Sequence, residues 1–224
     1  MRVAGAGLLA TLLAAWPAPA QLKVGQLSTH LTGTVSPGYS AEYGNQTSSS
    51  HNWTMAGAGT LSGNYFTPNF LAFNASFYLN QSRANSNFQS ITNASGVDAS
   101  TSIFSGSHFP GSVSYSRAYN SEGNYAVPGL PNFVTHGNSD TFGINWSENL
   151  PNLPTFTAGY QMGSSSYNVY GANNEGTSHF DSLNLHSSYD LAGFRLGAFY
   201  TLGGSHSMIP QLLGSLQETD LHSS

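Results

Sequence analysis

The stretch FLAFNASFYLN, residues 70–80, decides the fold class, because its side chains alternate strictly between two sets. The apolar set is Leu71, Phe73, Ala75, Phe77 and Leu79, and the second set is Ala72, Asn74, Ser76, Tyr78 and Asn80. Successive side chains of a β-strand point to opposite faces, so the alternation predicts a strand with one apolar and one more polar face. Its length matches the roughly ten residues with which a tilted strand crosses a membrane.

The same alternation recurs along the chain. It is clear in Thr155–Gly163 and Phe194–Leu202. Weaker versions occupy Leu31–Tyr43, Trp53–Gly63, Val97–Phe104, Gly111–Tyr119, Thr141–Trp146 and Asp181–Tyr189. The pattern predicts an all-β protein with about nine antiparallel strands in up-and-down order.

The connections between these strands alternate in length. The short ones are Tyr65–Asn69, His108–Gly111, Leu150–Pro154 and Asp190–Gly193. The long ones, rich in Ser, Asn and Gly, are Gly44–Asn52, Ser82–Gly96, Asn120–Gly137, Ser164–Ser178 and the chain from Gly203 onward. Short turns are therefore expected at one end of the sheet and long loops at the other.

Aromatic residues gather beside the short turns. The set is Tyr65, Phe66, Phe70, Phe104, Phe109, Trp146, Phe156, Tyr189 and Phe194. Aromatic rings prefer the interface between membrane and water, so the set is typical of an aromatic girdle. The general preference of aromatic residues for strands is an alternative explanation.

Residues 1–20 have the pattern of an export signal. Arg2 precedes the apolar run Val3–Trp16, and Ala18-Pro19-Ala20 forms a small-x-small cleavage site before Gln21. No later stretch approaches the roughly 20 apolar residues that a membrane-spanning helix needs. The mature chain is therefore expected to be exported without a helical anchor.

Composition excludes several classes of protein. Charged residues make up 7% of the chain, against about 25% in typical soluble domains. With 5 Lys plus Arg and a net charge of −5, the chain lacks the basic footprint of a nucleic-acid-binding protein. It has no cysteine, which excludes disulfides and thiolate zinc sites.

Taken together, these patterns over residues 21–205 resemble those of the porin-like outer-membrane β-barrels of Gram-negative bacteria. The resemblance implies a transmembrane barrel in the cell outer membrane, with short periplasmic turns and long extracellular loops. It implies contact with outer-membrane lipid, and insertion with the help of periplasmic chaperones and the barrel assembly machinery. It implies a channel for passive passage of small solutes or a structural barrel, and it leaves open whether the chain forms a homo-oligomer.

The C-terminal segment departs from this resemblance. Residues 206–224 lack the aromatic-terminated last strand of such barrels and read as a polar tail or a truncated extracellular loop. Nine strands also conflict with the even strand number of bacterial barrels. Either the chain is a fragment of a longer barrel, or the strand count is wrong.

The second face of the strands provides the candidate functional residues. The residues expected to face the lumen are Asn74, Ser76, Tyr78, Asn80, Asn145, Thr157, Gln161, Asn184, His186 and Arg195. This lining is polar and almost uncharged, so an open pore should show little charge selectivity. A lumen filled by a plug or by side chains would conduct nothing.

Other classes of function find less support. The eight histidines are scattered, and the pairs His179 with Asp181 and His136 with Asp140 lack the multi-ligand spacing of metal sites. No catalytic site, cofactor or metal is therefore expected. Arg117 falls on the apolar face near the end of its strand, where a long side chain reaches the headgroups. The alternative class is a secreted, soluble β-rich adhesin or binding protein.

Overall fold

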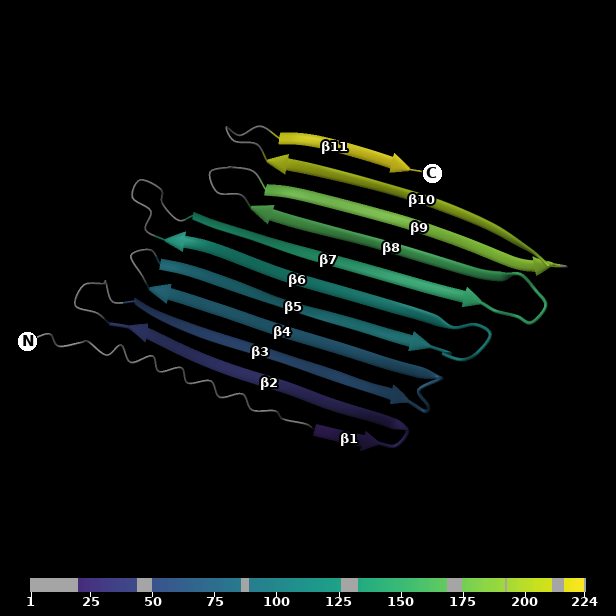
Figure 1. The fold of residues 1–224 in the computed structure, drawn as a ribbon, viewed down its shortest axis with the longest axis horizontal. Coiled ribbons are helices and arrows are strands. Elements are labelled where there is room, and N and C mark those ends of the chain that lie inside the picture. Colours follow the sequence, from purple (N-terminus) through teal and green to yellow (C-terminus); the bar gives the residue numbers. More distant parts are fainter. Residues whose placement is uncertain are drawn as a thin grey trace, which may run out of the picture.

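The computed structural model describes residues 20–43, 50–85, 89–125, 133–168, 175–191, 193–210 and 216–223. These residues form one antiparallel sheet of eleven strands, and each strand pairs with the strands that precede and follow it in the chain (Figure 1). The fold is therefore all-β and up-and-down, as the alternation predicts.

The strands are β1 (Ala20–Val24), β2 (Leu27–Glu42), β3 (Ser50–Tyr65), β4 (Leu71–Asn85), β5 (Gln89–Ile103), β6 (Gly111–Tyr125), β7 (Phe133–Glu148), β8 (Thr155–Asn168), β9 (Glu175–Leu191), β10 (Phe194–Pro210) and β11 (Leu216–Ser223). The nine predicted strands correspond to β2 through β10. The predicted total is two short, because β1 and β11 were not predicted. The predicted signal segment lies, except for Ala20, outside the described residues.

The two additional strands are short: β1 alternates over only five residues and β11 is mostly polar, which is why alternation did not reveal them. β1 has 5 residues and pairs with the start of β2 across a two-residue turn. Gly25 opens this turn at a φ of 60°, a left-handed conformation that glycine adopts without strain. β11 has 8 residues, so the described part of the segment 206–224, which was expected to be a polar tail or a loop, is strand: residues 206–210 end β10 and Leu216–Ser223 form β11.

Strands β2 through β10 are longer than their apolar patterns, with 14 to 17 residues each. Much of the predicted long connections Ser82–Gly96, Asn120–Gly137 and Ser164–Ser178 is consequently strand. Backbone pairing continues past the apolar residues because the hydrogen-bond ladder is independent of side-chain polarity. The sheet thus extends well beyond its apolar region.

The short turns carry an aromatic cluster. Phe70 contacts Phe66, Phe104 and Tyr65, with ring centroids 6.1, 5.5 and 6.4 Å away. Phe66 and Phe104 have φ angles of 65° and 54°, which are strained for bulky residues. The turns therefore place aromatic rings at this end of the sheet even though Phe66 and Phe104 adopt backbone conformations that phenylalanine disfavours.

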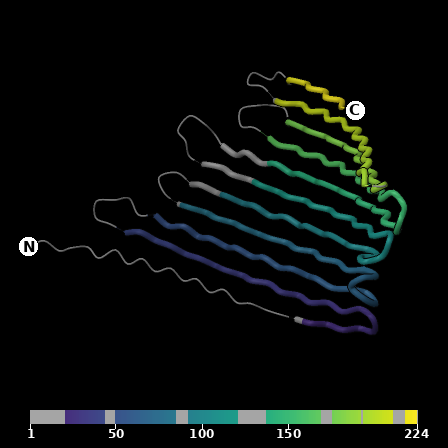
Figure 2. Tube along the Cα trace, turned by 45° about the vertical axis from the view of Figure 1, so that its right-hand side comes forward, coloured from purple at the N-terminus to yellow at the C-terminus, as the bar shows by residue number. Residues whose placement is uncertain are grey.

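The sheet is a single layer with open edges at β1 and β11 (Figure 2). Among the described residues, no apolar side chain is buried, and 33 large hydrophobic side chains are exposed. Nor do these residues include a helix long and apolar enough to cross a lipid bilayer. Within the described ranges, no second layer covers the apolar side chains.

Candidate functional site

The strand register divides the side chains into two faces, because residues directly opposite each other on paired strands share a face. All ten predicted lumen residues fall on one face, here called the polar face. Most of their register partners are small or polar, such as Ser100 for Asn74 and Ser182 for Gln161, but His186 lies between Thr157 and Phe199. On β2 through β7, the other positions of this face are mostly Ser, Thr, Asn, Ala and Gly. The structure therefore brings the predicted residues onto one surface.

Two hollows of the polar face contain seven of the ten residues. One, of about 290 Å³, is lined by Asn145, Thr157, Gln161, Asn184 and His186, together with Ser114, Gly143, Gly159 and Tyr160. The other, of about 200 Å³, includes Asn74 and Ser76. Tyr78, Asn80 and Arg195 lie on the same face but line neither hollow.

Glycines keep the larger hollow open. A Cβ atom added to Gly159 would lie 2.7 Å from Oδ1 of Asn145, and one added to Gly143 would lie 2.8 Å from Oγ of Ser114. A side chain at either position would occupy space that is now free. Sequence alternation did not single out these glycines, because glycine carries no face preference.

Hydrogen bonds and an ion pair hold the polar side chains of this face. Oγ1 of Thr201 donates to Oδ1 of Asn184 over 3.1 Å, and Oγ of Ser116 donates to Oδ1 of Asp98 over 2.6 Å. Arg195 is neutralised by Asp190, with Nε and Oδ1 3.1 Å apart. The described side chains of the polar face are therefore held by hydrogen bonds and by one ion pair among themselves.

The opposite face, here called the apolar face, carries most of the exposed large hydrophobic side chains of the strands. Exceptions on the polar face are Tyr78, Phe180, Phe199, Ile209 and Leu221. On the apolar face of β4 through β10, most of the large hydrophobic residues occupy the part of the strand next to the short turns, whereas β2 and β3 also carry Tyr39 and Trp53 near their other end. In β4 the hydrophobic residues run from Leu71 to Leu79 and are followed by Gln81 and Arg83. The part of the apolar face next to the short turns is here called the apolar band.

The apolar band is slanted relative to the hydrogen-bonded rows of the sheet. The row that starts at Leu71, the first band residue of β4, reaches β10 at Tyr200, which is six residues after Phe194. The row that starts at Leu79 reaches β10 at Met208, six residues after Leu202. Both borders of the band are therefore displaced by the same amount between β4 and β10.

This displacement gives the angle between the strands and the band. Six residues at about 3.3 Å each, over six strand spacings of about 4.8 Å, correspond to a tilt of about 35°. The band is about nine residues long on β4 and β10, so its height at this tilt is about 24 Å. The strands thus cross a level apolar layer obliquely.

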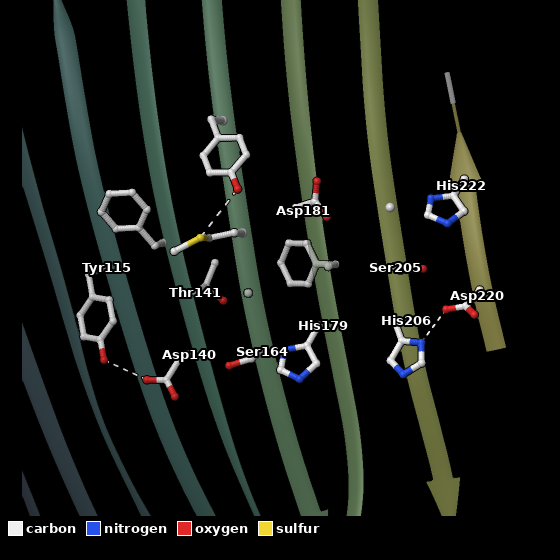
Figure 3. Close-up of a pocket in the computed structure, with 16 residues that line it drawn as sticks. Tyr115, Asp140, Thr141, Ser164, His179, Asp181, Ser205, His206, Asp220 and His222 are labelled. Carbon is white, nitrogen blue, oxygen red and sulfur yellow. Dashed lines mark hydrogen bonds and ion pairs between the residues drawn. The ribbon is translucent and has the colours of Figure 1, made fainter. Parts of the chain in front are cut away.

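A row of polar side chains crosses the apolar face beyond the band. Six strands contribute one residue each, in the order Arg117, Asp140, Ser164, His179, His206 and Asp220. Figure 3 shows the last five of these side chains in one line across the strands. Nε of Arg117 lies 3.6 Å from Oδ1 of Asp140, and the hydroxyl of Tyr115 donates a 2.8 Å hydrogen bond to the same oxygen. These six residues are here called the polar row. The row follows the hydrogen-bonded register, so it lies directly beyond the slanted band on β6, β7 and β8 and further from the band on β9 and β10.

The polar row borders a hollow of about 550 Å³ that also includes Phe142, Tyr160 and Met162 from the band. The pKa of His206 in this row is raised, chiefly by its hydrogen bond with Asp220. Burial acts in the opposite direction, and the negative charges of Asp220 and Glu218 add to the rise. His206, Glu218 and Asp220 also have donor atoms close enough to hold a metal ion together. Sequence spacing missed this group because β11 was not predicted.

Comparison with known protein families, with curated proteins and with solved structures finds no match for this chain.

Proposed function

We propose that this protein is a β-barrel of the bacterial outer membrane, with the apolar face toward lipid and the polar face around a lumen. One observation carries the proposal: the apolar band is slanted by about 35° relative to the rows of the sheet. Strands of outer-membrane barrels tilt by about 35–45° and carry an apolar layer about 25 Å tall. Both the tilt and the height of the band fit a bilayer.

The exposure of the apolar face supports the same proposal. A soluble monomer rarely exposes a continuous apolar surface larger than a few hundred Å². Here the apolar face extends over nearly all strands without a second layer among the described residues. Lipid covers such a surface without further protein, whereas a secreted adhesin would need another layer or partner.

The arrangement of the two edge strands supports the proposed closure of the sheet into a barrel. β1 and β11 run in the same direction and pair with opposite halves of their neighbours, Leu27–Leu31 of β2 and Gly203–Pro210 of β10. Both strands are antiparallel to β2 and to β10, so they fit into one strand position between these two. The seam then has antiparallel neighbours on both sides, as in bacterial barrels with an even strand number.

The depth of single residues in lipid vesicles tests the membrane proposal. Single cysteines at Leu79, Leu202 and Met208 would carry a fluorophore, and spin-labelled lipids would report its depth. We expect positions 79 and 202 at equal depth and position 208 about 16 Å further out, given a 3.3 Å rise and a 35° tilt. Equal depths for 79 and 208, which share a row, would contradict the slanted layer, and no quenching at all would favour the soluble adhesin.

The polar face supports a channel for small, neutral or mixed solutes. Its side chains are small and polar, and Arg195 is paired with Asp190. Selectivity in pores arises from charge on the wall, so this wall should discriminate little between anions and cations. Reversal potentials of single channels in a salt gradient should lie near zero. A strong preference for anions or for cations would contradict the proposal that the polar face lines the pore. The absence of any conductance would favour a structural barrel.

The resemblance to porin-like barrels extends the proposal to assembly. The first twenty residues would direct export, and periplasmic chaperones and the barrel assembly machinery would insert the strands, with the short turns on the periplasmic side. Export rests on the sequence pattern of residues 1–20, and the insertion partners rest on the resemblance.

A further inference from the structure

The polar row ends in a dense group of titratable side chains on β9, β10 and β11. The group comprises His179, Asp181, His206, Glu218, Asp220 and His222. The whole chain has only 8 histidines and 10 acidic residues, so three of each meet on three neighbouring strands. Because charged residues make up only 7% of the chain, a group of six titratable side chains on neighbouring strands is a candidate binding site.

The register creates the core of this group. His206 lies directly opposite Asp220, and Met208 lies opposite Glu218, so both carboxylates of β11 border the same imidazole. Nδ1 of His206 lies 2.5 Å from Oδ1 of Asp220 and 3.8 Å from Oε1 of Glu218. One donor atom from each residue lies within 4.8 Å of the other two.

These distances fit a shared metal ion. Zinc binds nitrogen and carboxylate oxygen at about 2.0–2.2 Å, which places tetrahedral ligand atoms about 3.4 Å apart. Small side-chain rotations bring the three donors to this spacing. The side chains of His206, Glu218 and Asp220 are 35%, 61% and 56% exposed, so an ion can reach them from solution.

We propose that His206, Glu218 and Asp220 bind a divalent transition-metal ion of the Zn²⁺ type. An imidazole with two carboxylates suits borderline first-row ions, whereas Ca²⁺ prefers oxygen ligands alone. His179 lies opposite His206 in the register of β9 with β10, outside the group of close donor atoms.

Gly204 leaves room next to the proposed site. A Cβ atom at this glycine would lie 3.3 Å from Nδ1 of His222 and 3.4 Å from Oδ1 of Asp181. An imidazole from β11 and a carboxylate from β9 thus converge on the same space above β10. The bound ion would join the edge strand β11 to β10 by bonds other than the backbone ladder.

Zinc binding by the folded, untagged full chain tests the site. Equilibrium dialysis against ZnCl₂ should give one bound ion per chain. His206→Ala and Asp220→Asn should each weaken binding at least about tenfold, because even the loss of an outer-shell partner costs about 10- to 100-fold. Glu218→Gln, at the more exposed position, should weaken binding less and keeps the test usable if another variant fails to fold.

Matched controls are available elsewhere on the sheet. His30→Ala on β2 and Glu148→Gln on β7 remove a histidine and a glutamate far from the group and should leave zinc binding unchanged. The proposal is overturned if the wild-type chain binds no Zn²⁺, or if His206→Ala binds it equally well. Equal binding of Ca²⁺ by the wild type and by His206→Ala, without preference for Zn²⁺, would also exclude a site built around the imidazole.

Discussion

The two faces of the sheet belong to the same strands, yet they differ in both the polarity and the size of their side chains. In β4 the apolar face presents Leu71, Phe73 and Phe77, whereas the polar face presents Ala72, Asn74 and Ser76. Small side chains and glycines line two hollows of the polar face, whereas large side chains form the apolar band and one wall of the hollow along the polar row. The difference teaches that odd and even positions are fitted to two different surroundings, which we propose to be lipid and lumen.

The largest effect is expected from a charge on the apolar face. Ala75→Arg places a cation in the middle of the apolar band of β4, which should lower the free energy of unfolding by about 2 to 4 kcal/mol, as for arginine at the bilayer midplane. The matched control is Ala72→Arg, three residues away on the polar face. Denaturant unfolding in lipid vesicles measures both, and equal losses would remove the distinction between the faces.

A smaller effect is expected from a filled hollow on the polar face. Gly159→Leu puts a side chain where an added Cβ already lies 2.7 Å from Oδ1 of Asn145, which should lower single-channel conductance several-fold. Gly57→Leu on the apolar face is the control, since its added Cβ meets nothing closer than 3.8 Å. An equal fall in conductance in both variants would mean that the solute pathway does not run along the polar face at Gly159.

The smallest effect is expected at the polar row. Arg117 and Asp140 are 61% and 36% exposed and 3.6 Å apart, so their ion pair should contribute at most about 1 kcal/mol, and less at high salt. A double-mutant cycle with Arg117→Gln and Asp140→Asn isolates this coupling in unfolding experiments. A coupling well above that value would mean that the row is shielded from water and lies inside the apolar layer.

Alternation predicted the two faces of the nine predicted strands well, because each carries enough large side chains to show which alternate positions belong to the apolar face. In Phe194–Leu202, for example, the residues of β10 on the apolar face were all identified. The ten predicted lumen residues share one face for the same reason. The function of that face is a separate question, which the conductance and depth experiments address.

Alternation could not predict what depends on pairing between strands. β1 alternates over only five residues and β11 is mostly polar, so neither strand has a periodic signal as long as those of the predicted strands. The group around His206 needs residues 206, 218 and 220 side by side, and only the register of β10 with β11 provides this. The slant of the apolar band likewise compares residues over several strands, whereas alternation describes each strand by itself.

The slanted band also restricts how this chain can change in length during evolution. An insertion of one residue within a strand exchanges its two faces, and an insertion of two keeps the faces but shifts part of the band by about 6.6 Å along the strand. Both changes disturb the pairing with the two strands on either side, because each inner strand pairs with two neighbours. Length variation among descendants of this chain should therefore accumulate in the connections beyond the polar row, while the spacing from short turn to polar row stays constant.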